Sequence, residues 1–433
     1  MPIPKTPVNI RSNARATPHA MLVDAIVDGE LAPGQRLHDE VLEERFSTTR
    51  SAIRAALFEL ETQWMVRIVP RRGTFVTDFE HNRGLQAVEV AAGVTMRAIT
   101  ECAGRLSEDD LGQLSAYRKR WLRVPEAVDE ALRTSQEDEG LYGIFFKASG
   151  NPELTRIRDW VLPYVKRLRR HSLDAGMIDP HTVMRTQREF ISDVLQGRLE
   201  SAAARIWEET DPLFGEYDDQ VLPSERAKPG VVLTRDLVAD TIEQAILDGT
   251  LVPGEPLPET DLMAWLGVSH TPVRQALDAL ANRVLVEQQI NRTARVATVD
   301  ATTAWQTSVA YGVLVRVALR RAMRLDPGEL LTVVGPHLDR YRTEPSTPVT
   351  EINDDVNHAV FEFSGAQVIA ELSERVAPRL RWHLIAGDEK LRPGAIRLAE
   401  QAKDAIASND PRALDRVETK IYDENPFVRD ATP

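Results

Sequence analysis

The chain of 433 residues contains a single cysteine, Cys102. One cysteine excludes a disulfide framework within the chain and a cysteine-based zinc site, so we expect Cys102 to be a buried, small apolar residue. Long uninterrupted apolar runs are missing too, and the N-terminus has no signal-peptide core. These absences predict a cytoplasmic protein that does not associate with a membrane.

One stretch of the chain occurs twice. Residues 33–76 read PGQRLHDEVLEERFSTTRSAIRAALFELETQWMVRIVPRRGTFV, and residues 253–296 read PGEPLPETDLMAWLGVSHTPVRQALDALANRVLVEQQINRTARV. The two copies align without a gap at a constant offset of 220 positions, which pairs Arg54 with Arg274. We interpret this match as an internal duplication, in a chain long enough for three or four domains.

Each copy predicts two helices joined by a tight turn. Residues 41–46 and 261–267 each look like a short helix, and a small polar break follows. Thr49 or Ser269 is placed to cap the next helix by accepting hydrogen bonds from free backbone N–H groups. Apolar residues at i, i+4 and i+7 of that helix predict one buried face. They are Ile53, Leu57 and Leu60 in the first copy, and Val273, Leu277 and Leu280 in the second.

The opposite face of this second helix begins with polar and basic residues. That pattern is typical of a helix-turn-helix, which places the start of the second helix in the major groove of DNA. Residues 65–76 then read as two short strands around a Pro-Arg-Arg-Gly turn, a wing whose tip can reach phosphate or the minor groove. The corresponding turn of the second copy, NRTA, lacks glycine, so we expect a wing of different shape. The predicted DNA-binding residues are Thr49, Arg50, Ser51, Arg54, Arg71, Arg72, Gly73, Ser269, His270, Thr271, Arg274, Arg292 and Arg295.

The order PGxxL, then TTRSAIRAAL or VSHTPVRQAL, then a wing resembles the winged helix-turn-helix of GntR-family transcription regulators. The resemblance implies sequence-specific binding to double-stranded DNA. Arg54 and Arg274 are then expected to contact guanine edges or the flanking phosphates, and Arg50 is placed for a bidentate contact with guanine. The hydroxyl groups at both helix starts are expected to donate to phosphates.

The charge of the chain is unevenly distributed. The total of 53 Lys and Arg against 66 Asp and Glu gives a net charge of −13, which by itself argues mildly against nucleic acid. However, residues 50–72 hold five arginines against two glutamates, and residues 270–295 hold four arginines against two acidic residues. A basic reading surface on an acidic body suits a regulator, because the body then does not bind DNA unselectively.

The rest of the chain has helical periodicity. Residues 79–220 contain six candidate helices and no convincing strand, which predicts an antiparallel bundle. The segment DEGLYGIFFKASGNPEL resembles the FCD effector domain of one branch of GntR regulators, and VNHAVFEFSGAQVIAEL echoes it later in the chain. The predicted fold class is therefore mainly α, with two winged helix-turn-helix domains that are each followed by an all-helical FCD-like bundle. The predicted domains are a flexible arm, 1–17; the first winged domain, 18–78; the first bundle, 79–220; a linker, 221–232; the second winged domain, 233–300; and a degenerate second bundle, 301–433.

The resemblance to the FCD domain implies a divalent metal held by one Asp and three His, which helps to bind a carboxylate effector. Asp138 stands at the position of the Asp, but Tyr142, Gln187 and Glu209 stand where histidines are expected. Because a borderline-soft metal such as zinc prefers imidazole, we predict no transition-metal site and no cofactor. Three alternatives stay open: Asp138 and Glu209 hold a harder cation, the four residues bind an organic effector directly, or no ligand binds. Asp354 and His358 in the second bundle are interpreted as a surface or cap pair.

Two such subunits fused head to tail would present both heads on one chain. Docking of the second head then becomes intramolecular, which raises its effective concentration. His270 stands where the first copy has Arg50, and Thr293 where it has Gly73, so the heads have diverged and we expect an operator with unlike half-sites. The sequence leaves open whether the pseudo-dimer stays monomeric or dimerises further, and whether it represses or activates.

Two other classes of function fit parts of the sequence. An architectural or scaffold protein would have one inactive head and no effector. An enzyme would place its site in the bundles, but the sequence offers no nucleophile–base constellation and no phosphate loop. We therefore predict that the chain is not an enzyme.

Overall fold

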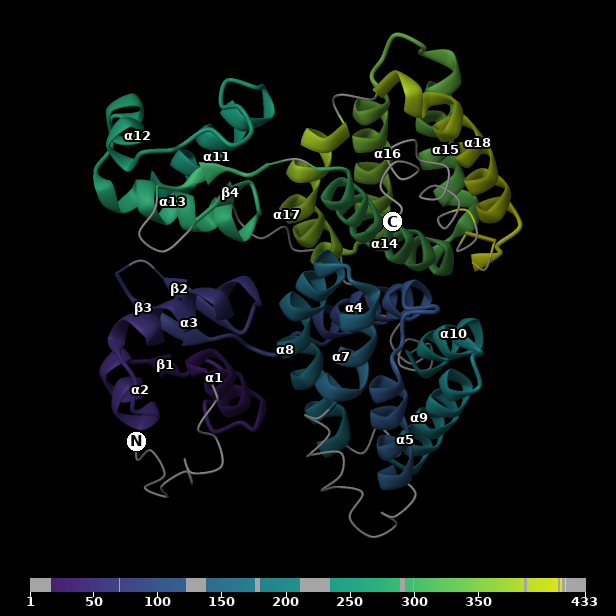
Figure 1. Ribbon diagram of the computed structural model, residues 1–433, viewed down its shortest axis with the longest axis horizontal. Helices are drawn as coiled ribbons and strands as arrows, with labels where there is room; N and C mark the ends of the chain where they lie inside the picture. Colours follow the sequence, from purple (N-terminus) through teal and green to yellow (C-terminus); the bar gives the residue numbers. More distant parts are fainter. Residues whose placement is uncertain are drawn as a thin grey trace. The chain divides into compact units, whose positions relative to one another are not determined.

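The computed structural model describes residues 17–69, 71–121, 138–175, 180–210, 234–288, 293–298, 300–384, 388–411, 413–414 and 417. These residues are mainly helical, and the chain divides into two compact units (Figure 1). The first unit comprises Met1–Ala92, Ala103–Phe145 and Arg156–Asp211, and the second comprises Gly93–Cys102, Phe146–Thr155 and Pro212–Pro433. Each unit contains one winged domain, called head 1 and head 2 below, and a set of packed helices, so the predicted fold class is confirmed.

Head 1 begins at Pro18, which stands in the first turn of its first helix after the N-cap Thr17. Its three helices pack around a small sheet of strand order β1-β3-β2, in which both pairs are antiparallel. Strands β2 and β3 form the predicted wing. The elements of head 1 are α1 (Pro18–Val27), β1 (Arg36–Leu37), α2 (Asp39–Phe46), α3 (Arg50–Thr62), β2 (Val66–Val69) and β3 (Gly73–Val76).

Head 2 repeats this order with a smaller sheet. Its strands β4 and β5 pair over two residues each, and the counterpart of β1 is a single bridge between Pro256 and Arg295. The elements of head 2 are α11 (Thr234–Leu247), α12 (Glu259–Leu266), α13 (His270–Asn282), β4 (Val286–Glu287) and β5 (Arg295–Val296).

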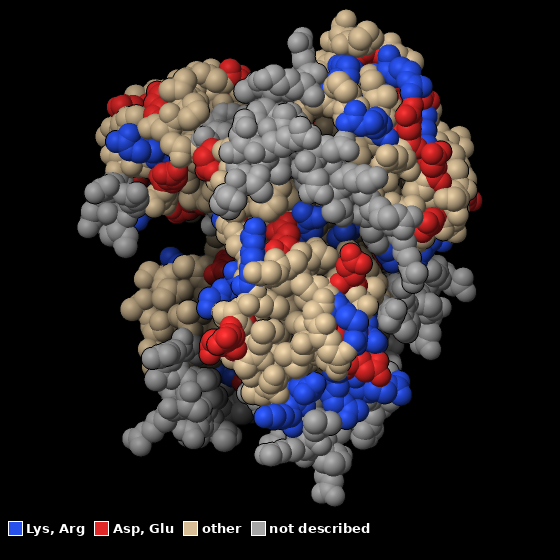
Figure 2. Space-filling model, turned by 45° about the vertical axis from the view of Figure 1, so that its right-hand side comes forward, with Lys and Arg blue, Asp and Glu red and all other residues tan. Residues whose placement is uncertain are grey.

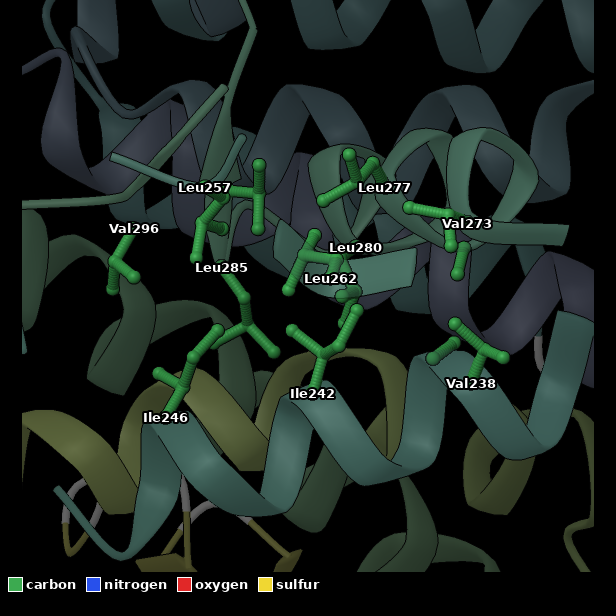
Figure 3. Packing of buried hydrophobic residues seen from close by; sticks show 13 residues of the cluster. Val238, Ile242, Ile246, Leu257, Leu262, Val273, Leu277, Leu280, Leu285 and Val296 are labelled. Carbon is green, nitrogen blue, oxygen red and sulfur yellow. The ribbon is translucent and has the colours of Figure 1, made fainter. Parts of the chain in front are cut away.

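The core of head 2 is built where α11 meets α13, with side chains of α12 and both strands closing it (Figure 3). The predicted buried face of α13 lies in it, and Val273, Leu277 and Leu280 are at most 1% exposed. The corresponding face of α3 is buried in head 1. Positions 220 residues apart serve both cores: Leu22, Ile26, Leu37, Leu42, Ile53, Leu57, Leu60 and Val76 in head 1, and Ile242, Ile246, Leu257, Leu262, Val273, Leu277, Leu280 and Val296 in head 2.

Both heads also share one strained backbone position. Trp64 has φ 58° and Val284, 220 residues later, has φ 57°, although the left-handed region disfavours a bulky or β-branched residue. The next residue, Met65 or Leu285, is fully buried and its amide donates to the carbonyl of Leu60 or Leu280. Burial of that side chain holds the turn that leads from α3 or α13 into the wing.

Six helices of the first bundle stand where the sequence predicted them. Within the first unit, α9 packs against both α5 and α10. Phe145, Tyr164 and Phe190 are buried there, and Cys102 is a buried free thiol as predicted. The six helices are α4 (His81–Glu101), α5 (Glu108–Trp121), α7 (Asp138–Ser149), α8 (Pro152–Asp174), α9 (Pro180–Leu195) and α10 (Leu199–Thr210).

A buried carboxylate joins the last two of these helices. The side chain of Asp193 in α9 is 4% exposed and accepts hydrogen bonds from Arg198 and, at 2.6 Å, from Arg205 of α10. Burial opposes its charge, but the two arginines outweigh that effect and hold the pKa of Asp193 below its ordinary value. We assign this cluster to the packing of the bundle, because its charges already satisfy one another.

The second unit is built around α14, which packs against α16 and α17, while α15 packs against α16 and α18. Charged side chains of both signs intersperse on its surface (Figure 2), and the Nζ atom of Lys403 lies 2.5 Å from Asp339. Two segments from early in the sequence also belong to this unit. Gln306 of α14 donates to the carbonyl of Gly150 at 2.9 Å, and Asn151 donates back to the carbonyl of Gln306 at 3.5 Å. The helices are α14 (Ala301–Leu325), α15 (Pro327–Thr343), α16 (Val349–Ser364), α17 (Gln367–Leu384) and α18 (Asp388–Ala407).

Replacing Leu280 by Ala tests the core of head 2. Leu280 is fully buried, so we expect the opening free energy of head 2 to fall by about 2–5 kcal/mol through lost burial and the cavity left behind. Hydrogen exchange of head 2 amides in the full chain measures it. The matched control is Leu237→Ala, because that side chain is 57% exposed and its loss should change the free energy by under about 0.5 kcal/mol. Equal effects of the two substitutions would contradict this core.

Candidate nucleic-acid interface

The predicted DNA-reading residues of head 1 lie together at the start of α3. Thr49 is the N-cap, and its Oγ1 accepts from the backbone N–H of Ala52 at 3.4 Å. Arg50, Ser51 and Arg54 are exposed on the side opposite the buried stripe. This arrangement presents two guanidinium groups and two hydroxyl groups, which lie 3.1 Å from each other, to solvent at one helix end, and such groups suit phosphate and base contacts.

A carboxylate from the preceding helix holds both arginines. Oδ2 of Asp39, the first residue of α2, accepts from Nε of Arg54 at 2.8 Å and from Nε of Arg50 at 3.3 Å. A guanidinium held through Nε keeps its two terminal nitrogens for another acceptor, such as the O6 and N7 pair of guanine. Sequence reasoning missed Asp39, and the signal that was available is the acidic residue at position 39 in the first copy and 259 in the second.

Head 2 presents the same positions with different chemistry. Ser269, His270, Thr271 and Arg274 are exposed at the start of α13. His270 pairs with Glu259, the first residue of α12, where head 1 pairs Arg50 with Asp39. Glu259 was missed in the same way as Asp39.

The N-cap position predicted for Ser269 is confirmed, but the capping hydrogen bond predicted for its side chain is not formed. Ser269 stands at the N-cap of α13 with extended backbone, but its side chain makes no capping hydrogen bond. The reason lies at the third helical position, where head 1 has Ala52 and head 2 has Pro272, which has no N–H to donate. The hydroxyl of Ser269 is therefore not committed to that backbone group.

The wing of head 1 has the geometry that its sequence predicts. The amide of Arg72 donates to the carbonyl of Val69 at 3.0 Å and closes the turn, and Arg71 has φ 63°. Arg71 and Arg72 are exposed at its tip. Gly73 has φ 109°, a backbone conformation that residues with a Cβ rarely adopt, so glycine is favoured at this position. Arg36 is a further basic residue at the wing that the sequence analysis did not select.

The wing of head 2 is only partly described. Arg292 lies outside the described residues. Arg295 is exposed in β5, and its Nη1 donates to the carbonyl of Gly254 at 3.0 Å, which ties this guanidinium to its own head. The turn for which a different shape is expected, residues 291–294, lies partly outside the described residues, and the described ladder pairs Val286 with Val296 and Glu287 with Arg295.

Head 1 is attached to α8 through the C-terminal end of α3. Because α3 and α13 begin with the predicted DNA-binding residues, each is called the reading helix of its head below. Gln63, the C-cap of α3, is 3% exposed, and its Nε2 donates to the carbonyl of Asp159 at 3.0 Å. Two guanidinium nitrogens of Arg167 donate to Thr77, to the carbonyl at 2.7 Å and to the hydroxyl at 3.1 Å. The hydroxyl of Tyr164 accepts from the amide of Glu80 at 2.8 Å. These contacts tie α8 to the C-terminal end of α3 and to the residues that follow the wing.

Head 2 uses a charged residue at the equivalent place. Arg283 is the C-cap of α13 and pairs with Glu243 of α11. Its charge also acts on two residues of α17. Burial and the neighbouring Glu371 raise the pKa of Glu374, and Arg283 opposes this shift. Burial is the main cause that lowers the pKa of Arg375, and the charge of Arg283 lowers it further. The C-cap residue of the reading helix thus faces a neighbouring helix in each head. In head 1 it is an amide that hydrogen-bonds to α8, and in head 2 it is a charged group that acts on α17.

Two histidines lie beside this attachment in the first unit. The ring of Phe79 lies 4.9 Å from that of His171 and 6.1 Å from that of His81, which begins α4. Burial, together with the charge that His171 can carry, lowers the pKa of His81. Uptake of a proton by His81 therefore opposes the packing of α4 on α8.

The predicted effector residues are partly brought together. The ring of Tyr142 in α7 lies 5.7 Å from that of Phe190 in α9, and Phe145 lies 5.5 Å from Phe190. Gln187, one turn before Phe190, is 3% exposed, and among the described residues its Oε1 has no hydrogen-bond donor. The side chains of Asp138 and Glu209 lie outside the described residues, although their backbone is helical.

Side chains suited to metal ions do not gather in the described part of the chain, where no three His, Cys, Asp or Glu side chains come together. This search does not reach the side chains of Asp138 and Glu209. His358 is exposed, and the partner that lies near it is Glu362, at 3.8 Å, whereas the sequence analysis paired His358 with Asp354. Among the described helices, none combines the length and the apolar character needed to cross a bilayer.

The lowered pKa of His81 predicts a pH dependence. As pH falls through about 6.5, the ordinary value for histidine, the unfolded chain takes up the proton before the folded chain does, so the stabilising contribution is present above that pH and is lost below it. We expect hydrogen exchange at the start of α4 and along α8 to accelerate as pH falls, after correction for intrinsic rates. His81→Phe should flatten this dependence, and His358→Gln, which removes an exposed histidine, should not. If hydrogen exchange of His81→Phe depends on pH as strongly as that of the wild type, His81 is not the source of the pH dependence.

Two regions of the chain, residues 19–76 and 234–296, match the model of the gntR family of bacterial regulatory proteins. The Glc operon transcriptional activator of Escherichia coli strain K12 is 41% identical over 63 residues, which are 14% of this chain and 25% of that protein. The HTH-type transcriptional regulator LutR of Bacillus subtilis strain 168 is 37% identical over 111 residues, which are 25% of this chain and 50% of that protein. The chain thus spans between a quarter and half of the length of these relatives.

Two solved structures are similar to part of the chain. A GntR regulator from Rhodococcus sp. RHA1 is 25% identical with a TM-score of 0.37, covering 46% of this chain and 99% of that chain. McbR/YncC of E. coli is 20% identical with a TM-score of 0.36, covering 46% of this chain and all of the other. The similarity to the gntR family of bacterial regulatory proteins therefore rests on the two matched regions, 19–76 and 234–296, which are the two winged heads of this chain.

Proposed function

We propose that this chain is a sequence-specific DNA-binding transcription regulator whose two heads act as a covalent pseudo-dimer on one operator. The observation that carries the proposal is the presence of two gntR-family heads, each with an exposed, basic start of its reading helix. The relatives named above are described as regulators of transcription, not as enzymes, which supports a non-catalytic role. Such a regulator acts on the chromosome and hence in the bacterial cytoplasm.

The pseudo-dimer is supported by two properties of the chain. Both heads have a complete core of their own at corresponding positions, so neither has lost the ability to fold. Segments Gly93–Cys102 and Phe146–Thr155 belong to the compact unit that contains head 2, and the Gln306–Gly150 and Asn151–Gln306 hydrogen bonds lie in that unit. Early and late parts of the sequence therefore share a core. One chain then supplies both reading surfaces, which raises the effective concentration of the second head once the first is bound.

The effector role belongs to the first bundle in this proposal. Tyr142 and Gln187 offer a phenol and a buried amide beside an aromatic wall, a set that suits a small organic ligand with polar groups. The contacts of α8 with Gln63 and Thr77 provide the route by which a change in the bundle reaches head 1. A divalent cation held by Asp138 and Glu209 is the alternative for this site.

Alanine substitution of the two equivalent arginines tests the two-headed reader. We expect Arg54→Ala and Arg274→Ala each to weaken binding to an operator by more than about tenfold, because each removes a charged contact to base or phosphate. Titration of the full chain at fixed salt, first against DNA upstream of its own gene and then against selected DNA, measures this. Lys147→Ala removes the same charge from an exposed site outside the heads and should leave affinity nearly unchanged.

Each outcome of that titration has a distinct meaning. If only one arginine matters, the other head is inactive and the chain is an architectural or scaffold protein of the kind considered above. If wild type prefers no DNA sequence over random sequence, sequence-specific regulation is excluded.

Substitution of Gln187 by Leu tests the effector site. A neutral, similar-sized side chain preserves the packing of α9 but removes the amide, so we expect DNA affinity to persist while the response to small ligands is lost. A screen of carboxylates and other polar metabolites, by thermal shift of wild type and of Gln187→Leu, measures it. Gln113→Leu on the exposed surface of α5 is the control. A ligand that stabilises both variants equally would refute the assignment of this site.

A further inference from the structure

The first residue of the reading helix differs between the heads in a way that affects charge. In head 1 it is Arg50, whose side chain is 51% exposed and lies 3.3 Å from Asp39 and 3.8 Å from Glu43. In head 2 it is His270, whose side chain is 57% exposed and pairs with Glu259. Arginine stays charged at every physiological pH, whereas histidine changes its charge between about pH 5 and 8.

Among the described residues, three positions of α12 and α13 bear on the charge near His270. Glu259 of α12 faces it, and a carboxylate oxygen of Glu259 pairs with Nε2 of His270. Met263 occupies the place where head 1 has a second carboxylate, Glu43, so α12 offers less negative charge than α2 does. Arg274 stands one turn later on the same helix and carries a further positive charge. An approaching phosphate or guanine then competes with Glu259 for the imidazole N–H groups.

We propose that His270 is a specificity-determining residue that makes reading of the second half-site depend on proton concentration, while Arg50 keeps reading of the first half-site constant. This inference rests on the two-headed reader proposed above. A protonated imidazole has two donors and suits phosphate or the acceptors of guanine; a neutral one has a single donor and one acceptor and suits a base that itself donates, such as adenine or cytosine.

The direction in which affinity for the second half-site changes with pH follows from the charge that a histidine gains at low pH. At low pH the second head makes one more charge-assisted contact, and as pH rises this contact weakens and the preference at that base changes. We expect affinity for the second half-site to fall roughly tenfold across this range. The slope of log affinity against log salt should also become shallower by about one unit, because one fewer counterion is released.

Selection from random double-stranded DNA by the full chain, at about pH 6 and about pH 8, tests the inference. We expect two unlike half-sites at the lower pH, with only one of them changing at the higher pH. His270→Arg should remove the change, and Arg50→His should transfer it to the first half-site. His38→Gln is the matched control, because His38 is an exposed histidine of head 1 outside the reading helix. Salt titrations on the selected duplex, with each half-site scrambled in turn, measure the affinity and slope of each head.

The outcomes separate this inference from the function on which it rests. If two half-sites are selected but neither changes with pH, or if His270→Arg retains the change, the role of His270 is refuted and the two-headed reader stands. A perfect palindrome that reads alike at both pH values also refutes it, because the heads are then equivalent. If no pair of half-sites is selected at either pH, the proposed function itself fails.

Discussion

Burial of one apolar stripe on the reading helix is the constraint on which both heads depend. Ile53, Leu57 and Leu60 in α3, like their counterparts in α13, are almost fully removed from water. Because residues at i, i+4 and i+7 share a helix face, their burial turns the opposite face outward. The arginines and hydroxyls at the start of each helix are exposed for this reason. The strained turn at Trp64 or Val284 then leads the chain into the wing from a fixed point.

Carboxylates behind the reading residues are the second common feature. An acidic side chain beside a DNA-facing arginine weakens attraction to phosphate, but it also fixes the guanidinium in one orientation. Orientation matters more where discrimination between bases is needed, since a bidentate contact requires both terminal nitrogens in one plane. Head 2 has a histidine–glutamate pair where head 1 has an arginine–aspartate pair, so the proposed reading surfaces differ at this position in the shape of the side chain and in its capacity to carry charge.

The link between bundle and head uses the opposite end of the same helix. In head 1 the C-cap Gln63 is buried and bonded to the backbone of α8, so the position of α3 depends on that helix. In head 2 the corresponding Arg283 is held by carboxylates of its own head and acts on α17 through its charge. A hydrogen bond to backbone is short-ranged and directional, whereas a charge acts over a longer distance and is weakened by salt. The two heads are thus coupled to their bundles by different physical interactions.

The sequence by itself determined the heads and the helical character of the bundles. Periodicity, turn residues and the gapless repeat are local signals, and they predicted α3, α13, the first wing and six helices of the first bundle. Only the tertiary structure decided what those signals do not contain. It placed Asp39 against Arg54 from another helix, and it grouped residues 93–102 and 146–155 with the second unit. Local propensity specifies which face of a helix is buried, but partners distant in sequence are set by packing, which no periodicity records.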